Sequence, residues 1–347
     1  MELKKLMSNY LKTYFIFLVP IIALSSMTGQ AVKIAILDTE QPDKKRFGSP
    51  DCSNHDKLNS FFGGGAKFDR EATKSIRQSN GQKNENKSFC LMGKKQFWMR
   101  LMQKNHGSIT QALIRTVAPD VEILTIPILG KHGYANKQKL YDGLLQARQA
   151  QVDIVHMGLQ IFDLDETYPL DQKIITLIQS FPYVVAPAGN HGDVIDHVGY
   201  PAAIAGVIGV GSFGQQKERY VHSRFCQATV QTPVDFIMLG ENIWTSVWVD
   251  EIQNYVMMPV SGTSFSAASM TGVLALMLEK NNKHLPKDKV IELLQICSYK
   301  RDISWNGCVK YGTPAVEELL YHLQKLVSLK KKKVERYFAQ LRNFISS

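Results

Sequence analysis

Apolar runs that predict strands alternate along this chain with segments that predict helices. The first run, residues 32–37, is short and β-branched, which is typical of a strand buried on both faces. Further strands are predicted at residues 121–129, 152–159, 183–186 and 205–210, with a weaker β pattern over 234–249. Helices are predicted at residues 109–117, 138–151, 171–180 and 287–297. This order predicts an α/β fold, a doubly wound and mostly parallel sheet with helices on both faces.

One further helix, residues 261–280, is apolar almost throughout. A helix without a polar face is expected in the middle of a core. Its first turns contain the small residues Ser266, Ala267, Ala268, Ser269 and Gly272. Small side chains let a helix approach its neighbours closely, so we expect tight packing on this segment.

The N-terminal segment, residues 1–31, has the three regions of a secretory signal peptide. A basic start leads into the apolar run 14–24, and small or polar residues follow as far as Ala31. The apolar run is too short to span a bilayer. We predict cleavage near Ala31 and a secreted or periplasmic protein; an uncleaved anchor or a buried N-terminal segment is the alternative.

The rest of the chain divides into a core domain, residues 32–325, and a basic C-terminal tail, residues 326–347. Within the domain, residues 41–104 are rich in Gly, Ser, Asn and Lys, which predicts a surface insertion with little regular structure. The tail has apolar residues near helical spacing among its bases. Such a helix can contact an anionic membrane surface, and a solvated terminal helix is the simpler interpretation.

Composition and charge exclude several classes of protein. The chain has 347 residues, of which 44% are hydrophobic and 21% charged, as in ordinary globular proteins. The formal net charge is +10, to which residues 1–31 contribute +2 and the segment from Lys325 contributes +6, leaving +2 for residues 32–324. Because the domain is nearly neutral, we expect no binding to nucleic acid.

The five cysteines are too few for a disulfide scaffold, and their odd number leaves at least one unpaired. Cys297 and Cys308 are the pair we expect to form a bridge; buried free thiols are the alternative. The cysteine spacing matches no metal site, so no metal is predicted.

Four polar residues at the predicted ends of elements suggest acyl-transfer chemistry. Asp38 and Asn190 follow strands, whereas His106 and Ser264 are predicted to open helices. Acyl transfer needs a hydroxyl nucleophile, a base, a carboxylate that orients the base and donors for the oxyanion. In a doubly wound sheet the carboxyl ends of the strands meet at one rim, so we expect these four side chains to converge there.

The flanks of these residues resemble those of the subtilisin-like serine proteases. The matching stretches are VKIAILDT around Asp38, NHGS around His106, VDIVHMGL before Gln160, VVAPAGNHG around Asn190, YPAAIAGVIGVGSF after Gly199 and SGTSFSAAS around Ser264. They follow the family's order. The resemblance implies a subtilisin-like fold over residues 32–325.

The same resemblance implies roles for individual residues. Ser264 would be the nucleophile, His106 the general base and acid, and Asp38 the group that holds the imidazole. Asn190 and the backbone N–H of Ser264 would stabilise the oxyanion. Gly158, Leu159 and Gln160 would bind an extended peptide substrate beside the strand.

The motifs also depart from the family pattern. Glu40 stands where a glycine is usual, Ala268 takes the place of a proline, and Gln160 replaces a glycine in the substrate-binding motif. The first core strand begins directly after Ala31, so we expect folding without the family's usual pro-domain. The family often binds calcium, but no acidic loop identifies a site here.

We therefore predict a secreted, monomeric serine endopeptidase that acts on peptides or proteins and needs no cofactor. The alternative is a catalytically silent protein of the same fold that binds a peptide or another partner. An α/β-hydrolase is excluded because the chain lacks both the G-x-S-x-G motif and the order Ser, Asp, His.

Overall fold

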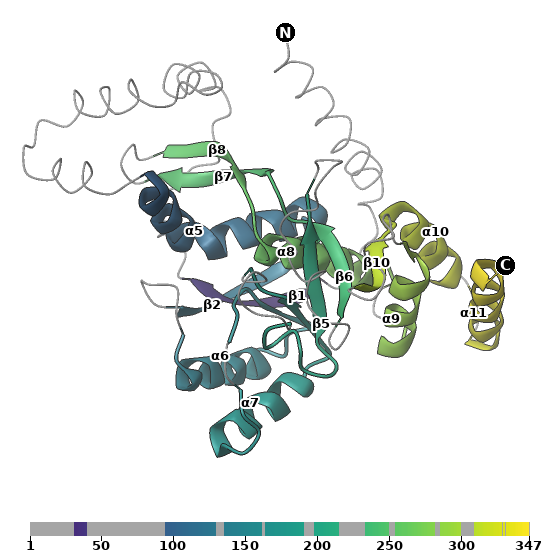
Figure 1. Cartoon of the computed structure of the whole chain (residues 1–347). Coiled ribbons are helices and arrows are strands. Elements are labelled where there is room, and N and C mark those ends of the chain that lie inside the picture. The colour runs from purple at the N-terminus through teal and green to yellow at the C-terminus, as the bar shows by residue number, and fades with distance from the viewer. Residues whose placement is uncertain are drawn as a thin grey trace, which may run out of the picture.

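An eight-stranded sheet forms the middle layer of the protein (Figure 1). The computed structural model describes residues 31–39, 94–129, 135–161, 164–190, 198–214, 233–249, 254–281, 285–299, 309–327, 329 and 331–346. The strands are β1 (Lys33–Thr39), β2 (Glu122–Leu129), β3 (Ile154–Met157), β4 (Tyr183–Pro187), β5 (Ile208–Phe213), β6 (Val234–Leu239), β9 (Ser298–Tyr299) and β10 (Val309–Pro314). Their order is β2-β1-β3-β4-β5-β6-β10-β9, and all neighbours are parallel except β9 and β10. The predicted fold class is confirmed.

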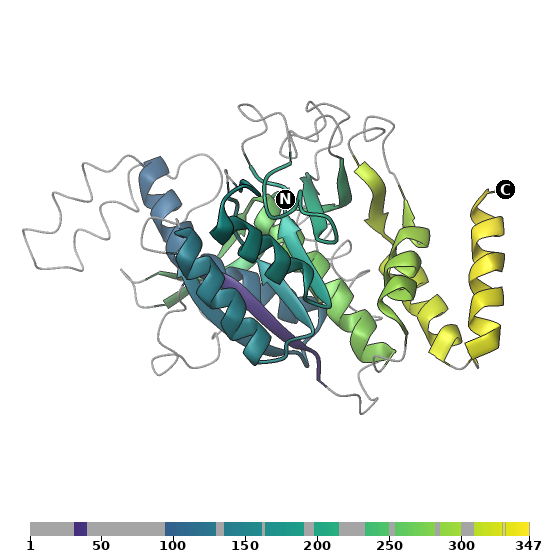
Figure 2. The same ribbon diagram turned by 90° about the horizontal axis from the view of Figure 1, so that it is seen from below.

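Helices cover both faces of this sheet, as Figures 1 and 2 show. Strand β1 explains why, because its side chains alternate between two apolar clusters. Ile34 and Ile36 pack in a cluster with α5 (Lys94–Val117) and α8 (Thr263–Lys280). Ala35 and Leu37 pack in another with α6 (Lys137–Gln149) and α7 (Pro169–Gln179). Because both faces of β1 are buried, its residues 34–37 form a continuous apolar run.

Helix α8 lies in the middle of the first cluster, and every residue from Met270 to Leu278 is buried. Gly272 marks its close approach to α5. A Cβ placed on Gly272 would lie 2.7 Å from the Cβ of Val117 and 3.1 Å from the backbone oxygen of Ile114. The expected tight packing on this helix is confirmed at that position.

The C-terminal helices pack at the β10 end of the sheet (Figure 1). They are α9 (Lys287–Ile296), α10 (Val316–Val327) and α11 (Lys331–Ser346). The structure differs from the expected solvated tail, because Phe338 of α11 is fully buried and Leu341 is 9% exposed within the same core cluster as α9. Separately, β7 (Ile243–Val249) and β8 (Asn254–Val260) form an antiparallel hairpin.

Two expectations about the segment before the second strand are wrong. Helix α5 begins at Lys94, so residues 94–104 are helical rather than irregular, and His106 lies within the helix rather than at its start. The reason is tertiary, because Leu101 is 7% exposed and packs in the same core cluster as α8. The rest of the predicted insertion lies outside the described residues. Residues 1–30 of the predicted signal peptide also lie outside them.

The expected bridge between Cys297 and Cys308 is also not formed, since Cys297 is a free, buried thiol. Cys308 lies outside the described residues. Within the described part of the chain, none of the helices combines the length and apolar character needed to cross a lipid bilayer.

Candidate active site

Asp38 lies at the carboxyl end of β1 and is completely buried. The register of the pairing between β1 and β2 shifts between Asp38 and Thr39, so the regular strand pairing ends at Asp38. Asp38 Oδ1 accepts a hydrogen bond from the backbone N–H of Thr39 at 2.6 Å, and Oδ2 accepts one from Thr110 Oγ1 at 3.3 Å. These donors stabilise the ionised carboxylate in its buried position.

His106 is oriented by this carboxylate. Its Nδ1 lies 2.7 Å from Asp38 Oδ1 and 2.8 Å from Oδ2, a geometry in which Nδ1–H donates and Nε2 points away. The backbone N–H of Gly107 donates to Thr39 Oγ1 at 2.9 Å and fixes α5 against the end of β1. Burial opposes protonation of the imidazole, but the charge and hydrogen bond of Asp38 outweigh it and raise the pKa of His106.

Two residues of the β3 region pack behind this pair. Gly158 is required there, because a Cβ at that position would collide with Asp38 Oδ2 and lie 3.4 Å from His106 Cε1. His156 is fully buried, and its Nδ1 lies 2.9 Å from Thr271 Oγ1. Burial lowers the pKa of His156 to about 4, so this second imidazole stays neutral and adds no charge beside the pair.

Asn190, after β4, is held against the first residue of α8. Its Oδ1 accepts hydrogen bonds from both the backbone N–H and the Oγ1 of Thr263, each at 2.9 Å. Because a backbone N–H can only donate, the amide oxygen must face Thr263 and Nδ2 must point elsewhere. Thr263 Oγ1 in turn accepts from the N–H of Gly189 at 3.2 Å. The amide of Asn190 is therefore fixed in one orientation, with Nδ2 directed away from Thr263.

Ser264 is the second residue of α8 and is 8% exposed. The first N–H groups of a helix have no intrahelical acceptor, and no described group accepts from that of Ser264. Gly262 precedes the helix with φ 155°, and a Cβ placed on it would lie 3.6 Å from Asn190 Nδ2. The ring of the adjacent Phe265 contacts that of His106, with 5.3 Å between centroids. No hydrogen bond joins His106 to Ser264 among the described residues.

Gln160 occupies a narrow slot beside Asn190. A Cβ on Gly189 would lie 2.6 Å from Gln160 Oε1, and a Cβ on Gly199 would lie 2.8 Å from Gln160 Cδ. The side chain is thus enclosed between two glycine backbones that have no room for side chains of their own. Leu159 is buried at 6% exposure, and Ile161 forms an isolated antiparallel bridge with Tyr200.

The structure brings the predicted residues together in two groups. Asp38 and His106 are hydrogen-bonded, and Asn190 is hydrogen-bonded beside Ser264, with the contact between Phe265 and His106 connecting the groups. Thr110 was not predicted, and Thr263, which was expected only to permit the turn before Ser264, was not predicted to hold Asn190. Thr110 lies four positions after His106 on one helix, a spacing that could have identified it.

A cavity of about 860 Å³ lies elsewhere, at the start of strands β4, β5 and β6. It is lined by Tyr183, Ile208 and Val234, the first residues of those strands. The candidate residues follow the other ends of the parallel strands, so this cavity is not part of their site.

Comparison with known sequences gives one family. A profile of the subtilase family matches residues 29–296 of the chain. An intracellular serine protease from Paenibacillus polymyxa is 29% identical over 213 residues, which cover 58% of this chain and 61% of that protein. Alkaline elastase YaB from Bacillus sp. (strain YaB) is 25% identical over 270 residues, which cover 76% of this chain and 58% of that protein. The chain thus matches less than two thirds of the length of either relative.

Solved structures agree on the fold. The PatG macrocyclase in complex with peptide superposes with a TM-score of 0.54 at 14% identity, covering 85% of this chain and 92% of that one. The self-cleaved protease domain of PatA gives a TM-score of 0.52 at 19% identity, covering 86% of this chain and 99% of that one. At these identities the likeness concerns the fold alone.

Proposed function

The chain belongs to the subtilase family, and on this premise we propose that it is a secreted serine endopeptidase that hydrolyses peptide bonds through an acyl-enzyme at Ser264. The observation that carries the proposal is the two hydrogen-bonded pairs: Asp38 of β1 with His106 of α5, and Asn190 with Thr263 at the start of α8. One group supplies an oriented base, and the other supplies an oriented amide donor.

In the acylation step, His106 Nε2 takes the proton of Ser264 Oγ as that oxygen attacks the substrate carbonyl carbon. Asp38 keeps Nδ1 protonated and stabilises the imidazolium that forms. The hydrogen bond from Ser264 to His106 would form when substrate binds, since such contacts are often long in free enzymes.

Negative charge then develops on the carbonyl oxygen. Asn190 Nδ2 and the Ser264 N–H would donate to it, aided by the N-terminal end of the α8 dipole. When the intermediate collapses, His106 gives its proton to the leaving amine. Water then attacks the acyl-enzyme by the reverse proton transfers, releasing the acid and restoring Ser264.

The substrate would lie extended beside residues 158–160. Because the Gln160 side chain fills the slot beside Asn190, the side chain on the acyl side of the scissile bond should be small. Replacing Gln160 with Ala should shift cleavage of a peptide library toward larger residues at that position. Unchanged preferences would contradict a substrate-binding role for Gln160.

Labelling with a fluorophosphonate probe tests the nucleophile. We expect the probe to label the folded protein at Ser264, and Ser264→Ala to abolish labelling and lower kcat by about 10⁶-fold. Ser261→Ala is the matched control, because Ser261 is a nearby exposed serine outside the helix. Labelling that persists in Ser264→Ala would refute the assignment.

The missing hydrogen bond between His106 and Ser264 keeps the catalytically silent alternative open. The silent alternative predicts that the folded protein binds peptides but neither cleaves them nor reacts with the fluorophosphonate probe. Calorimetric peptide binding together with absent labelling would favour that alternative.

Secretion is a separate part of the proposal and is supported by the three-region pattern of residues 1–31. One relative is named as intracellular, so the location needs its own test. We expect residues 1–31 to export a fused reporter and the mature chain to begin near Val32. A mature protein that retains Met1 would contradict cleavage.

A further inference from the structure

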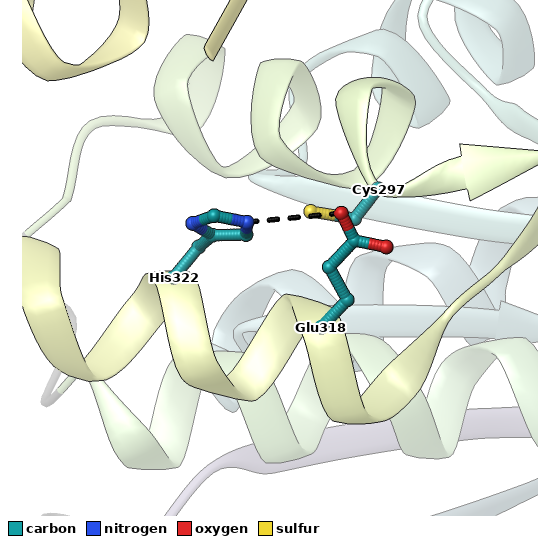
Figure 3. Close-up of side chains that lie close together, drawn as sticks. All are labelled: Cys297, Glu318 and His322. Carbon is teal, nitrogen blue, oxygen red and sulfur yellow. Dashed lines mark ion pairs between the residues drawn. The ribbon is translucent and has the colours of Figure 1, made fainter. Parts of the chain in front are cut away.

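Three side chains of different chemistry converge where α9 meets α10 (Figure 3). Cys297 directly follows α9, and Glu318 and His322 lie one turn apart on α10. One sulfur, one carboxylate oxygen and one imidazole nitrogen all lie within 4.8 Å of one another. Among the described residues, no other group of three metal-ligating side chains is this close.

Secondary structure holds the donors in place. The backbone N–H of Ala315 donates to the carbonyl of Cys297 at 2.7 Å, which joins the cysteine to the start of α10. The pairing of Ser298 with Pro314 continues this connection between β9 and β10. Cys297 itself is only 2% exposed, and its thiol is free. The buried sulfur therefore faces the two α10 side chains from a rigid framework.

The imidazole of His322 is oriented by neighbouring rings. Its Nδ1 lies 2.8 Å from the hydroxyl of Tyr337 on α11, and the ring of Tyr321 packs against it edge-on at 5.2 Å. Nε2 lies 3.7 Å from Glu318 Oε1. Ligating histidines usually donate their second ring N–H to a fixed partner in this way. Nδ1–H would donate to Tyr337, and the Nε2 lone pair would remain available.

We propose that Cys297, Glu318 and His322 form a zinc-binding site. Sulfur, imidazole nitrogen and carboxylate oxygen are the ligand types that Zn²⁺ takes, whereas Ca²⁺ and Mg²⁺ prefer oxygen alone. Tetrahedral bonds of the usual lengths place ligand atoms about 3.3–3.7 Å apart. The spacing of Nε2 and Oε1 already meets this range, and the half-exposed Glu318 can adjust. Water would complete the coordination.

A cation also suits the local charge. Cys297 is buried with its sulfur close to the carboxylate of Glu318. Binding of Zn²⁺ would release the thiol proton to solvent, and the thiolate and the carboxylate would then coordinate the cation.

The site would stabilise the C-terminal part of the fold. It joins α9 to α10 directly and reaches α11 through Tyr337. None of its donors belongs to β1, α5 or α8, which carry Asp38, His106 and Ser264. The proposal therefore does not depend on peptidase activity.

The test uses the tag-free full chain after chelator treatment. Titration with Zn²⁺ should show one tight site and a rise in Tm. Co²⁺ in place of Zn²⁺ should give thiolate-to-cobalt charge-transfer absorption, because a sulfur ligand is present. Absence of tight binding, or a cobalt spectrum without that band, would overturn the proposal.

Variants assign the ligands. Cys297→Ser should remove the charge-transfer band, and Glu318→Gln and His322→Gln should each weaken Zn²⁺ binding at least tenfold. Tyr337→Phe should weaken it about 10–100-fold by releasing the His322 ring, without removing a ligand. Glu317→Gln, the adjacent residue on α10, is the matched control and should bind as the wild type does. Equal affinity in all variants would place the ion at other cysteines and refute the site.

Discussion

At the scale of single residues, the contact between Asp38 and His106 makes activity depend on pH. The carboxylate raises the pKa of His106 above its usual 6.5, although burial opposes it. A general base must be neutral, so kcat/KM should rise with pH and reach half its maximum above pH 6.5. The pH dependence of stability has the opposite sign. The stabilisation that protonated His106 contributes is present below pH 6.5 and is lost as pH rises through the pKa of His106 in the folded protein.

Asp38→Asn tests this interpretation of the pH profile. The variant should lose about 10⁴-fold in kcat, because an amide in place of the carboxylate neither keeps Nδ1 protonated nor stabilises the imidazolium. Its remaining activity should show an acidic limb at lower pH than the wild type, since the group that raises the pKa of His106 is gone. A limb at unchanged pH would mean that another group controls the profile.

Thr263 is a second positioning residue. Its hydroxyl donates a hydrogen bond to Asn190 Oδ1 and accepts one from the backbone N–H of Gly189. Thr263→Val should lower kcat about tenfold with KM nearly unchanged, whereas Asn190→Ala should lower it about 10²–10³-fold. Thr263→Ser keeps the hydroxyl and should restore kcat.

A double variant separates positioning from general damage. If Thr263 acts through Asn190, Thr263→Val should have little further effect on kcat in the Asn190→Ala background. Additive losses in the double variant would indicate that Thr263 supports the site by another route.

At the scale of elements, the crossing of α5 and α8 depends on Gly272. Alanine is the better helix former by about 1 kcal/mol, but its Cβ would meet Val117 and the Ile114 backbone, and overpacking costs about 1–3 kcal/mol. We expect Gly272→Ala to lower the free energy of unfolding by up to about 2 kcal/mol in urea denaturation.

Ser269→Ala, one turn earlier on the same helix, is the control for Gly272→Ala. Ser269 is only partly buried and its hydroxyl bonds to the backbone of its own helix, so its loss should change stability by less than about 0.5 kcal/mol. A Gly272→Ala variant more stable than the wild type would show that the helices do not cross this closely.

At the scale of the whole molecule, the C-terminal helix is part of one core. Phe338 is fully buried in the cluster that contains α8, and the ammonium of Lys289 lies 4.9 Å from its ring. Phe338→Ala should lower the free energy of unfolding by about 3 kcal/mol in a single transition. Lys333→Ala, an exposed change on the same helix, should have almost no effect. If Phe338→Ala left the main transition unchanged, α11 would be an independent appendage.

The sequence alone predicted the alternation of strands and helices as far as α9 and proposed four candidate catalytic residues, but it did not predict β8, β10 or α10. Local periodicity predicts the strands that precede Asp38 and Asn190, and parallel strands must bring their carboxyl ends to one rim, so these two residues became candidates without coordinates. The start of α5 was mispredicted because its first turns depend on burial of Leu101 rather than on local pattern.

Tertiary structure alone decided the contacts between elements. It brought Gly158 against Asp38, held the amide of Asn190 on Thr263, buried Phe338 and grouped Cys297 with the α10 side chains. These distances depend on how helices and strands pack, and residues far apart in sequence carry no local signal of them. For that reason the sequence suggested a disulfide at Cys297, where the fold places a carboxylate and an imidazole.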